Sequence, residues 1–227
     1  TVVDGNQIWN AEQRAILNDQ TLTMREALYW PLNVGSIQAL KFLGDNPDEI
    51  TAVGRERMYN YYNDKFRFGH ATGIELIEQE GFIWDPHAEI YGLDAAYANM
   101  TFGQNLSATM IQTATAFSSV VNGGIWRTPS VVKGTLGSDG TIKPLENREK
   151  VEDHILSEET SAAMRSLLVN NRSYKARAGI DKPGYDVGGK SGTAQVIVNG
   201  AYDDSMSNLV GSYIGFIAPS GKMPEYV

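Results

Sequence analysis

The residues best suited to chemistry in this chain of 227 residues surround one lysine. In Val187-Gly-Gly-Lys190-Ser191-Gly192-Thr193-Ala-Gln-Val-Ile-Val198, that lysine is flanked by glycines and hydroxyls and leads into β-branched residues. A lysine ammonium can stabilise a substrate carboxylate or a developing oxyanion, and hydroxyl groups can donate to the same group. The run is compatible with a phosphate-binding loop or with an active-site strand, and these two interpretations lead to unrelated enzymes.

The phosphate-binding interpretation rests on the spacing from Gly184 to Ser191, which fits the consensus G-x-x-x-x-G-K-S/T. Such a loop needs a buried strand before it and a helix after it. The preceding stretch 170–183 is polar and contains Pro183. After Lys190, the dipeptide Asn199-Gly200 is a strong signal for a two-residue β-hairpin turn. We therefore predict a strand after the lysine and reject the phosphate-binding loop.

A lysine at the start of an exposed strand suits an extended peptide substrate. The free N–H and C=O groups of a strand edge allow a peptide to add as a further strand. Gly192 has no Cβ and lets that peptide backbone come close. Taken by itself, Lys190 also fits a surface lysine after a Gly-Gly turn, so the interpretation needs support from other segments.

Lys190-Ser191-Gly192-Thr193-Ala194 resembles the K-S/T-G-T-A element of the penicillin-binding protein and serine β-lactamase superfamily. Further segments resemble the transpeptidase domain of class B penicillin-binding proteins, in the family's order. These are residues 22–35, around the S-x-N element, and residues 68–81, 102–124 and 212–219. The resemblance therefore covers the chain from about Leu22 onward.

Two departures from the family pattern concern the proton-transfer and acylation residues. The acylated serine of the S-x-x-K element should precede S-x-N, but the S-x-x-K run found here, Ser130-Val-Val-Lys133, follows it. It lies in a β-branched run led by Pro129 that predicts a strand, so we interpret it as coincidental. The S-x-N position reads Pro31-Leu32-Asn33. We expect residues 1–227 to form a single partial transpeptidase domain, truncated at both ends, whose nucleophilic serine lies upstream.

The resemblance implies an α/β (α+β) fold, in which an antiparallel sheet is flanked by helices beside a mostly helical subdomain. It implies a peptidoglycan D,D-transpeptidase, which forms an acyl-enzyme with one stem peptide and cross-links it to another. The implied partners are stem peptides, β-lactam antibiotics and cell-wall synthesis proteins that include a glycosyltransferase. The implied location is the extracytoplasmic face of the bacterial cell membrane, with an N-terminal anchor that is not in this chain.

The same resemblance assigns roles to individual residues. Asn33 would hydrogen-bond the substrate amide, and Lys190 would hold the electrostatics and the proton network. Ser191 and Thr193 would bind the substrate carboxylate, while the N–H of Thr193, just after Gly192, would form half of an oxyanion hole. No cofactor is implied, and the scattered histidines predict no metal site.

Two other functions stay open at this point. A non-catalytic scaffold or β-lactam sensor would explain Pro31, because proline has no hydroxyl to relay a proton. A class D-like β-lactamase ranks lower, since residues 68–81 and 102–124 are typical of a cell-wall synthase.

Composition adds exclusions. The net charge of −8 argues against nucleic acid as a partner, and the absence of cysteine excludes disulfides and thiolate metal sites. There is no apolar run of about 18 residues, the length needed to span a bilayer.

The elements that position these motifs follow from capping signals and periodicity. Thr23-Met-Arg-Glu26 is a capping box that opens a helix. Pro31 suits the first position of the next helix, which presents Val34, Ile37, Leu40 and Leu43 on one face. Further helices are predicted at 55–65, 110–121 and 157–169, strands at 193–198, 210–218 and from 224 onward, and turn-rich loops at 137–150 and 170–186.

Overall fold

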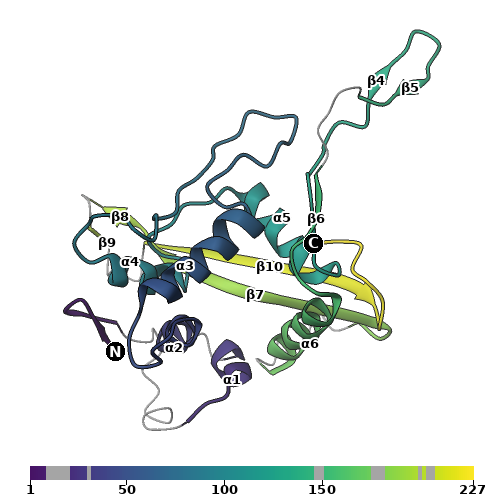
Figure 1. Cartoon of the computed structure of the whole chain (residues 1–227). Coiled ribbons are helices and arrows are strands. Elements are labelled where there is room, and N and C mark those ends of the chain that lie inside the picture. The colour runs from purple at the N-terminus through teal and green to yellow at the C-terminus, as the bar shows by residue number, and fades with distance from the viewer. Residues whose placement is uncertain (9–20, 30–31, 146–150, 175–181, 199–200, 203–207) are drawn as a thin grey trace.

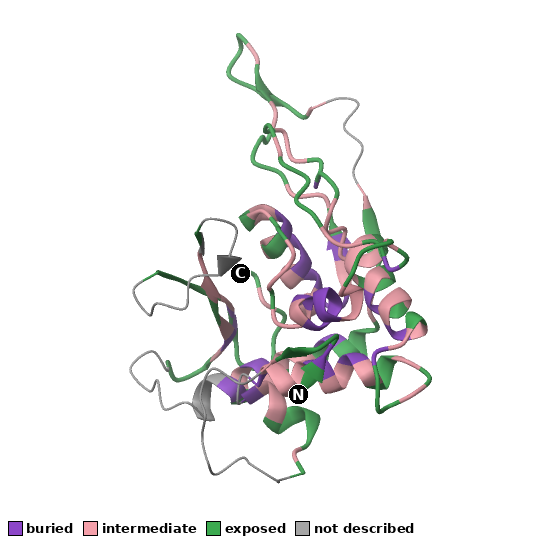
Figure 2. Cartoon of the chain, turned by 90° about the vertical axis from the view of Figure 1, so that its left-hand side faces the viewer, coloured by how far each residue is buried: buried purple, intermediate pink, exposed green. Residues whose placement is uncertain are grey.

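Helices dominate the first half of the chain, and one long antiparallel strand pair dominates its last part (Figure 1). This computed structural model describes residues 1–8, 21–29, 32–145, 151–174, 182–198, 201–202 and 208–227. The predicted fold class, an antiparallel sheet flanked by helices beside a mostly helical part, is confirmed. Buried residues collect along the packed helices, whereas the projecting segments are largely exposed (Figure 2).

The helical part contains α1 (Met24–Tyr29), α2 (Asn33–Leu43), α3 (Ala52–Asn60), the π-helical turn η2 (Tyr61–Lys65) and α4 (Leu93–Met100). Ile37 and Leu40 of α2 are each 1% exposed and belong to one apolar cluster with Met58 of α3 and Tyr97 of α4. The predicted apolar face of α2 is therefore confirmed at these two positions. It is wrong at Leu43, which is 38% exposed.

Reciprocal caps begin two helices. At α1, the Glu26 carboxylate accepts the N–H of Thr23 at 2.8 Å, and the Thr23 hydroxyl accepts the N–H of Glu26 at 3.3 Å. The Thr23 N–H and the Thr23 hydroxyl, which donates to the same carboxylate at 2.8 Å, hold the pKa of Glu26 below its ordinary value. The predicted capping box is confirmed. A second capping box, between Thr109 and Gln112, opens α5 (Met110–Val121).

The long strand pair consists of β7 (Tyr185–Gln195) and β10 (Leu209–Pro219), in antiparallel register with Lys190 opposite Ile214. Between them, β8 (Ile197–Val198) and β9 (Ala201–Tyr202) form a hairpin in which Val198 pairs with Ala201. This pairing confirms the predicted hairpin, although Asn199 and Gly200 lie outside the described residues.

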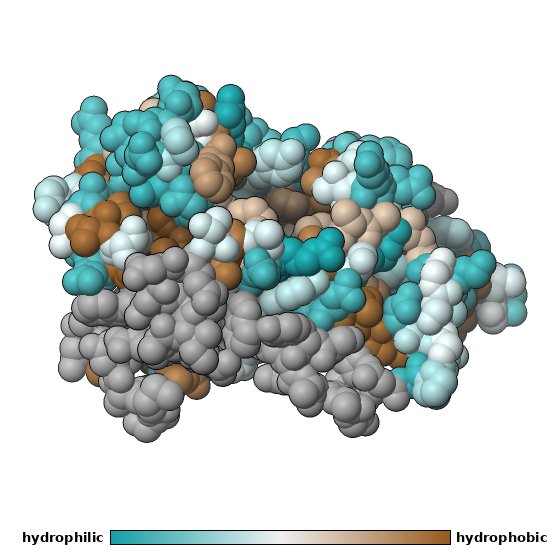
Figure 3. Space-filling model, turned by 90° about the horizontal axis from the view of Figure 1, so that it is seen from below, coloured by the Kyte–Doolittle hydropathy of each residue, from teal (hydrophilic) through white to brown (hydrophobic). Residues whose placement is uncertain are grey.

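Helices α5 and α6 (Glu158–Tyr174) pack together against one face of this pair, where Val121, Leu168 and Phe216 form a second apolar cluster. The approach is close at Gly188, because a Cβ there would lie 2.6 Å from the Phe216 ring and 3.0 Å from the backbone nitrogen of Val169. Gly188 thus lets α6 and β10 come together over the strand that carries Lys190. Seen from below, hydrophobic residues lie in several patches among hydrophilic ones on the described surface (Figure 3).

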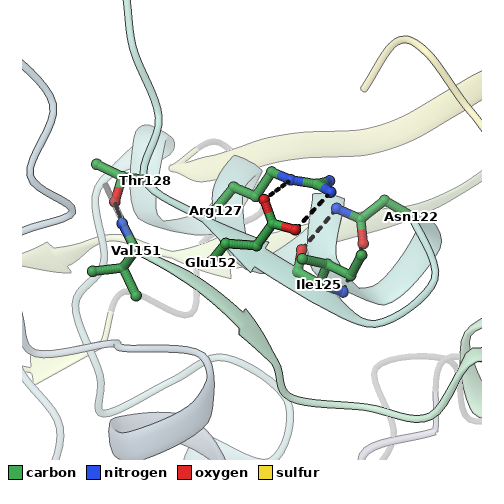
Figure 4. Close-up of polar contacts among 6 residues, drawn as sticks. All are labelled: Asn122, Ile125, Arg127, Thr128, Val151 and Glu152. Atoms are coloured by element: carbon green, nitrogen blue, oxygen red, sulfur yellow. Dashed lines mark hydrogen bonds and ion pairs between the residues drawn. The ribbon is translucent and has the colours of Figure 1, made fainter. Parts of the chain in front are cut away.

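The remaining strands are short: β1 (Val2–Val3), β2 (Asn6–Gln7), β3 (Ile125–Arg127), β4 (Thr135–Leu136), β5 (Ile142–Lys143) and β6 (Glu152–His154). Strand β3 follows a turn that the side-chain amide of Asn122 closes by donating to the Ile125 carbonyl at 2.7 Å (Figure 4). An ion pair between Arg127 and Glu152, at 3.1 Å, joins β3 to β6 and lowers the pKa of Glu152. The β4–β5 hairpin projects from the body (Figure 1).

The predicted strand in the run led by Pro129 is wrong, because residues 128–134 lie in no strand. Instead, the Glu75 carboxylate accepts the Ser130 hydroxyl at 2.7 Å and the Val131 N–H at 3.0 Å. The Glu75 carboxylate therefore satisfies a backbone N–H that a sheet ladder would otherwise pair.

Three other predicted boundaries need correction. Helix α6 continues to Tyr174 and β7 begins at Tyr185, so regular structure extends into both ends of the predicted loop 170–186. The predicted loop 137–150 contains β5. The strand predicted from Pro224 onward is reduced to one bridge between Tyr226 and Ile217. Across the ranges that the structure describes, no helix is both long enough and apolar enough to cross a membrane.

Candidate active site

Lys190 lies in the middle of β7, with paired residues on both sides of it. The prediction that it starts the strand is therefore wrong, and so is the alternative of a surface lysine after a Gly-Gly turn. Gly188 and Gly189 are themselves strand residues, opposite Phe216 and Gly215. A phosphate-binding loop requires a glycine-rich loop that leads into a helix, and this geometry rejects it, as predicted.

One edge of β7 carries backbone groups that β10 does not engage. In an antiparallel pair, residues that exchange both hydrogen bonds alternate with residues that exchange none. At the two ends of the register, Val196 donates to Asn208 at 3.2 Å and Ser220 donates to Gly184 at 2.9 Å. Even-numbered residues of β7 therefore face β10, and the N–H and C=O groups of odd-numbered residues point to the opposite edge. No strand among the described residues pairs with that edge, which we call the open edge of β7.

Two of the predicted site groups, the Lys190 ammonium and the Thr193 N–H, lie along the open edge. Its odd-numbered residues include Ser191 and Thr193, so the N–H of Thr193 points outward there, as the oxyanion-hole assignment requires. The Nζ atom of Lys190 donates to the carbonyl oxygen of Ser191 at 2.7 Å. The ammonium therefore reaches the same edge, next to the donor at Thr193.

The hydroxyl residues lie on the other face of the strand from Lys190, because successive side chains alternate. Ser191 is half-buried and opposite Tyr213, whereas Thr193 is exposed. Gly192 is also exposed, and a Cβ there would meet the Ser212 hydroxyl at 2.6 Å. The missing side chain at Gly192 thus accommodates Ser212 on the neighbouring strand.

Asn33 lies on a separate element, at the first residue of α2, where Leu32 is the N-cap. Because Asn33 is the first residue of α2, the helix fixes the position of its backbone. The prediction that Pro31 takes the first position of this helix is wrong, because α2 begins at Asn33; Pro31 and its neighbour Trp30 lie outside the described residues. The role of Asn33 toward substrate stays a prediction.

Two amide side chains secure β7 from other parts of the chain. The Nε2 atom of Gln104, in the segment after α4, donates to Oε1 of Gln195 at 3.0 Å. The Nδ2 atom of Asn171, in α6, donates to the carbonyl oxygen of Gly189 at 3.1 Å. Sequence reasoning missed both contacts, because they join residues that local periodicity does not relate.

The segment 68–82 is held by buried polar groups. The Glu78 carboxylate accepts the Thr72 hydroxyl at 2.6 Å and the Gly73 N–H at 2.8 Å. Burial pushes the pKa of Glu78 upward, but the hydrogen bonds from Thr72, Gly73 and Ile74 outweigh it, so this pKa lies below its ordinary value. Gln112 then ties the segment to α5, because its side-chain amide donates to the carbonyl oxygens of His70 and Glu80.

Along the open edge, the Lys190 ammonium lies beside the outward N–H groups of β7. An extended peptide can pair with these N–H groups, and the ammonium can stabilise its carboxylate or a developing oxyanion. Within the described ranges, histidine and acidic side chains form no group of three that would hold a metal ion.

Comparisons with known proteins agree with this geometry. Residues 3–227 match the family described as the penicillin binding protein transpeptidase domain. Stage V sporulation protein D of Bacillus subtilis is 34% identical over 165 residues, which cover 72% of this chain and 25% of that protein. The probable peptidoglycan D,D-transpeptidase PenA of Neisseria gonorrhoeae is 30% identical over 77% of this chain and 27% of its own length.

Solved structures show the same fold. The crystal structure of penicillin-binding protein 3 from Mycobacterium tuberculosis, complexed with ampicillin, has a TM-score of 0.77 and is 23% identical. The match covers 98% of this chain and 46% of that one. The chain spans about a quarter of the length of the curated relatives named above. With its family match, its fold and its K-S-G-T strand in agreement, the chain belongs to the penicillin-binding protein transpeptidase domain family.

Proposed function

We propose that the protein containing this chain is a peptidoglycan D,D-transpeptidase that acts through a serine outside residues 1–227. The observation that carries the proposal is the open edge of β7, where the Lys190 ammonium and the Thr193 N–H lie together. The family match and the relative that is named a D,D-transpeptidase support it.

In the proposed reaction, the serine hydroxyl attacks the carbonyl carbon between the two D-alanines of a stem peptide. An ester to the serine forms, the amide bond breaks, and the terminal D-alanine leaves with the proton. The amine of a neighbouring stem peptide then attacks the ester, forms the cross-link and releases the serine. No cofactor enters these steps.

The described residues supply the surroundings of the reacting carbonyl. Lys190 contributes positive charge and a proton-transfer path, and the Thr193 N–H contributes half of the oxyanion hole. The hydroxyls of Ser191 and Thr193 bind the substrate carboxylate, and Asn33 binds the substrate amide. The substrate backbone aligns with the open edge as an added strand.

The proposal extends to ligands, partners and location. β-Lactams acylate the same serine, which the ampicillin complex of the mycobacterial relative supports. Peptidoglycan lies outside the cytoplasmic membrane, so the site works on the extracytoplasmic face, and we propose an N-terminal anchor that this chain does not include. Cell-wall synthesis proteins, including a glycosyltransferase, are the proposed partners.

The test is acylation of the full-length protein by a labelled penicillin. Lys190→Ala should slow acylation by about 10²–10³-fold, the usual cost of losing one transition-state donor. The matched control is Lys182→Ala, which removes a lysine whose ammonium lies over the Tyr185 ring, before β7 begins. Equal rates for the two variants would contradict the proposal, and the absence of any adduct on the parent would favour a non-catalytic scaffold.

A further inference from the structure

Asn171 is a buried amide beneath the active-site strand. It lies in α6, is 5% exposed, and donates from Nδ2 to the Gly189 carbonyl oxygen at 3.1 Å. Its Oδ1 atom is buried and accepts no hydrogen bond from the residues that the structure describes. Burying an amide whose acceptor has no partner lowers the stability of the folded protein. An apolar side chain would avoid this cost but could not donate to the Gly189 carbonyl, so we look for the role of Asn171 in that hydrogen bond.

The bonded carbonyl belongs to the open edge. Gly189, Ser191 and Thr193 are successive odd-numbered residues of β7, so their backbone groups point to the same side. Along this edge, the Asn171 side chain donates to the Gly189 carbonyl oxygen, and the Lys190 ammonium donates to the Ser191 carbonyl oxygen. The amide of Asn171 therefore marks the upstream end of the edge at which a substrate strand can add.

The peptide unit that Asn171 holds is the one that leads into Lys190. Gly188 and Gly189 have no side chains to restrain it, and glycine populates more backbone conformations than any other residue. Larger residues do not fit, since a Cβ at Gly189 would lie 2.3 Å from the Tyr213 hydroxyl. Close packing thus demands glycine. The N–H end of the Gly189–Lys190 peptide faces β10, and Asn171 holds its carbonyl end, so this peptide is held from both sides.

We propose that Asn171 is a positioning residue for Lys190 and for the substrate-binding edge of β7. By fixing the Gly189 carbonyl, it sets the direction from which the Lys190 side chain leaves the strand. It also occupies the Gly189 carbonyl, as Lys190 occupies that of Ser191, so the first outward carbonyl that neither side chain occupies is that of Thr193. This inference rests on the proposed transpeptidase function.

The test compares variants of the full-length protein in their reaction with a fluorescent penicillin, separating the dissociation constant of the first complex from the acylation rate at saturation. Asn171→Leu keeps the approximate size of the side chain and removes the donor, and Asn171→Ala removes the donor together with the rest of the amide. Both should acylate roughly tenfold more slowly at saturation, the value of one lost hydrogen bond. The dissociation constant should change less than the rate.

Two controls separate positioning from folding. Asn170→Leu changes the adjacent amide, which lies near Ser166 on the same helix. Ser161→Ala destabilises α6 elsewhere, because Ser161 is fully buried and bonds the backbone of Val120 and Gly123. Thermal melts measure how much stability each variant loses, so the acylation rates of the Asn171 variants and of Ser161→Ala can be compared at equal loss.

The expected result is slow acylation in both Asn171 variants and near-parental rates in the two controls. Equal saturating rates for Asn171→Leu and Ser161→Ala at matched stability would overturn the positioning role. If one Asn171 variant does not fold, the other decides. A parent protein that forms no penicillin adduct would contradict the proposed function. An adduct that forms at the same rate in every variant would instead contradict only the positioning role of Asn171.

Discussion

The side-chain amide of Gln112 donates to the carbonyl oxygen of Glu80 at 2.8 Å, across 32 positions of sequence. The same nitrogen donates to the carbonyl of His70 at 2.7 Å, and Oε1 accepts the Thr109 N–H at 2.8 Å. One side chain, 2% exposed, therefore caps α5 and closes the segment 68–82 at once.

Replacing this amide should destabilise the protein. We expect Gln112→Ala to lower the free energy of unfolding by about 1–3 kcal/mol, because the His70 and Glu80 carbonyls lose their donor and the Thr109 N–H loses its acceptor. Gln79→Ala, at an exposed position in the same segment, should stay within about 0.5 kcal/mol of the parent. Urea unfolding curves measure both, and similar losses for the two variants would contradict the role of Gln112.

Gly124 should tolerate no side chain. Its φ is +89°, and a Cβ would lie 2.1 Å from the Leu156 carbonyl oxygen. Gly140 has a similar φ of +79° but open space around the Cβ position, which makes it a matched control. We expect Gly140→Ala to destabilise by about 1–2 kcal/mol through backbone strain, and Gly124→Ala to destabilise by about 1–3 kcal/mol more through the clash. Thermal melts that rank the two variants equally would contradict this packing.

The Glu78 carboxylate should make stability depend on acid pH. Its folded pKa is lowered from an ordinary value of 4.5, so its contribution is present above that value and is lost as pH falls through the folded pKa. Glu78→Gln should therefore lower the melting temperature at neutral pH, and the difference from the parent should shrink below about pH 4.5. The exposed Glu80, changed to Gln, is the control. A constant difference at all pH values would exclude ionisation as the cause.

Pro31→Ser tests the departure at the S-x-N position. A positioned proton relay is typically worth about 10²–10⁴-fold in rate, so restoring a hydroxyl should speed acylation of the full-length protein by a labelled penicillin. Loss of the proline should lower stability by roughly 0.4–1 kcal/mol, because the unfolded chain gains freedom. Pro129→Ser is the matched control. Slower acylation in Pro31→Ser would mean that the site is built around the proline.

The sequence predicted those elements whose signals are local. Thr23 and Glu26 stand three residues apart and cap each other, and Asn199-Gly200 separates two strands that pair. The K-S-G-T motif and its neighbouring segments predicted the fold, because their order reflects an arrangement shared by the family.

What the sequence could not predict depends on contacts between distant residues. The strand at Lys190 begins at Tyr185 because Phe216 and α6 pack on Gly188, and glycines at 188 and 189 otherwise indicate a turn. The run after Pro129 looks like a strand from its β-branched residues, but the Glu75 carboxylate binds its backbone instead. No sequence pattern around Asn171 or Gly189 indicates the hydrogen bond between them, because that bond depends on how α6 packs on β7.

The most direct test of the proposed function is to identify the acylated residue. The full-length protein is labelled to completion with a penicillin, digested, and mapped by mass spectrometry. The proposed function predicts one adduct, on a serine outside residues 1–227 that belongs to an S-x-x-K element, and strongly slowed labelling in Lys190→Ala. An adduct on Ser130, on Ser191 or on any other serine of this chain would contradict it, as would a full-length protein that forms no adduct.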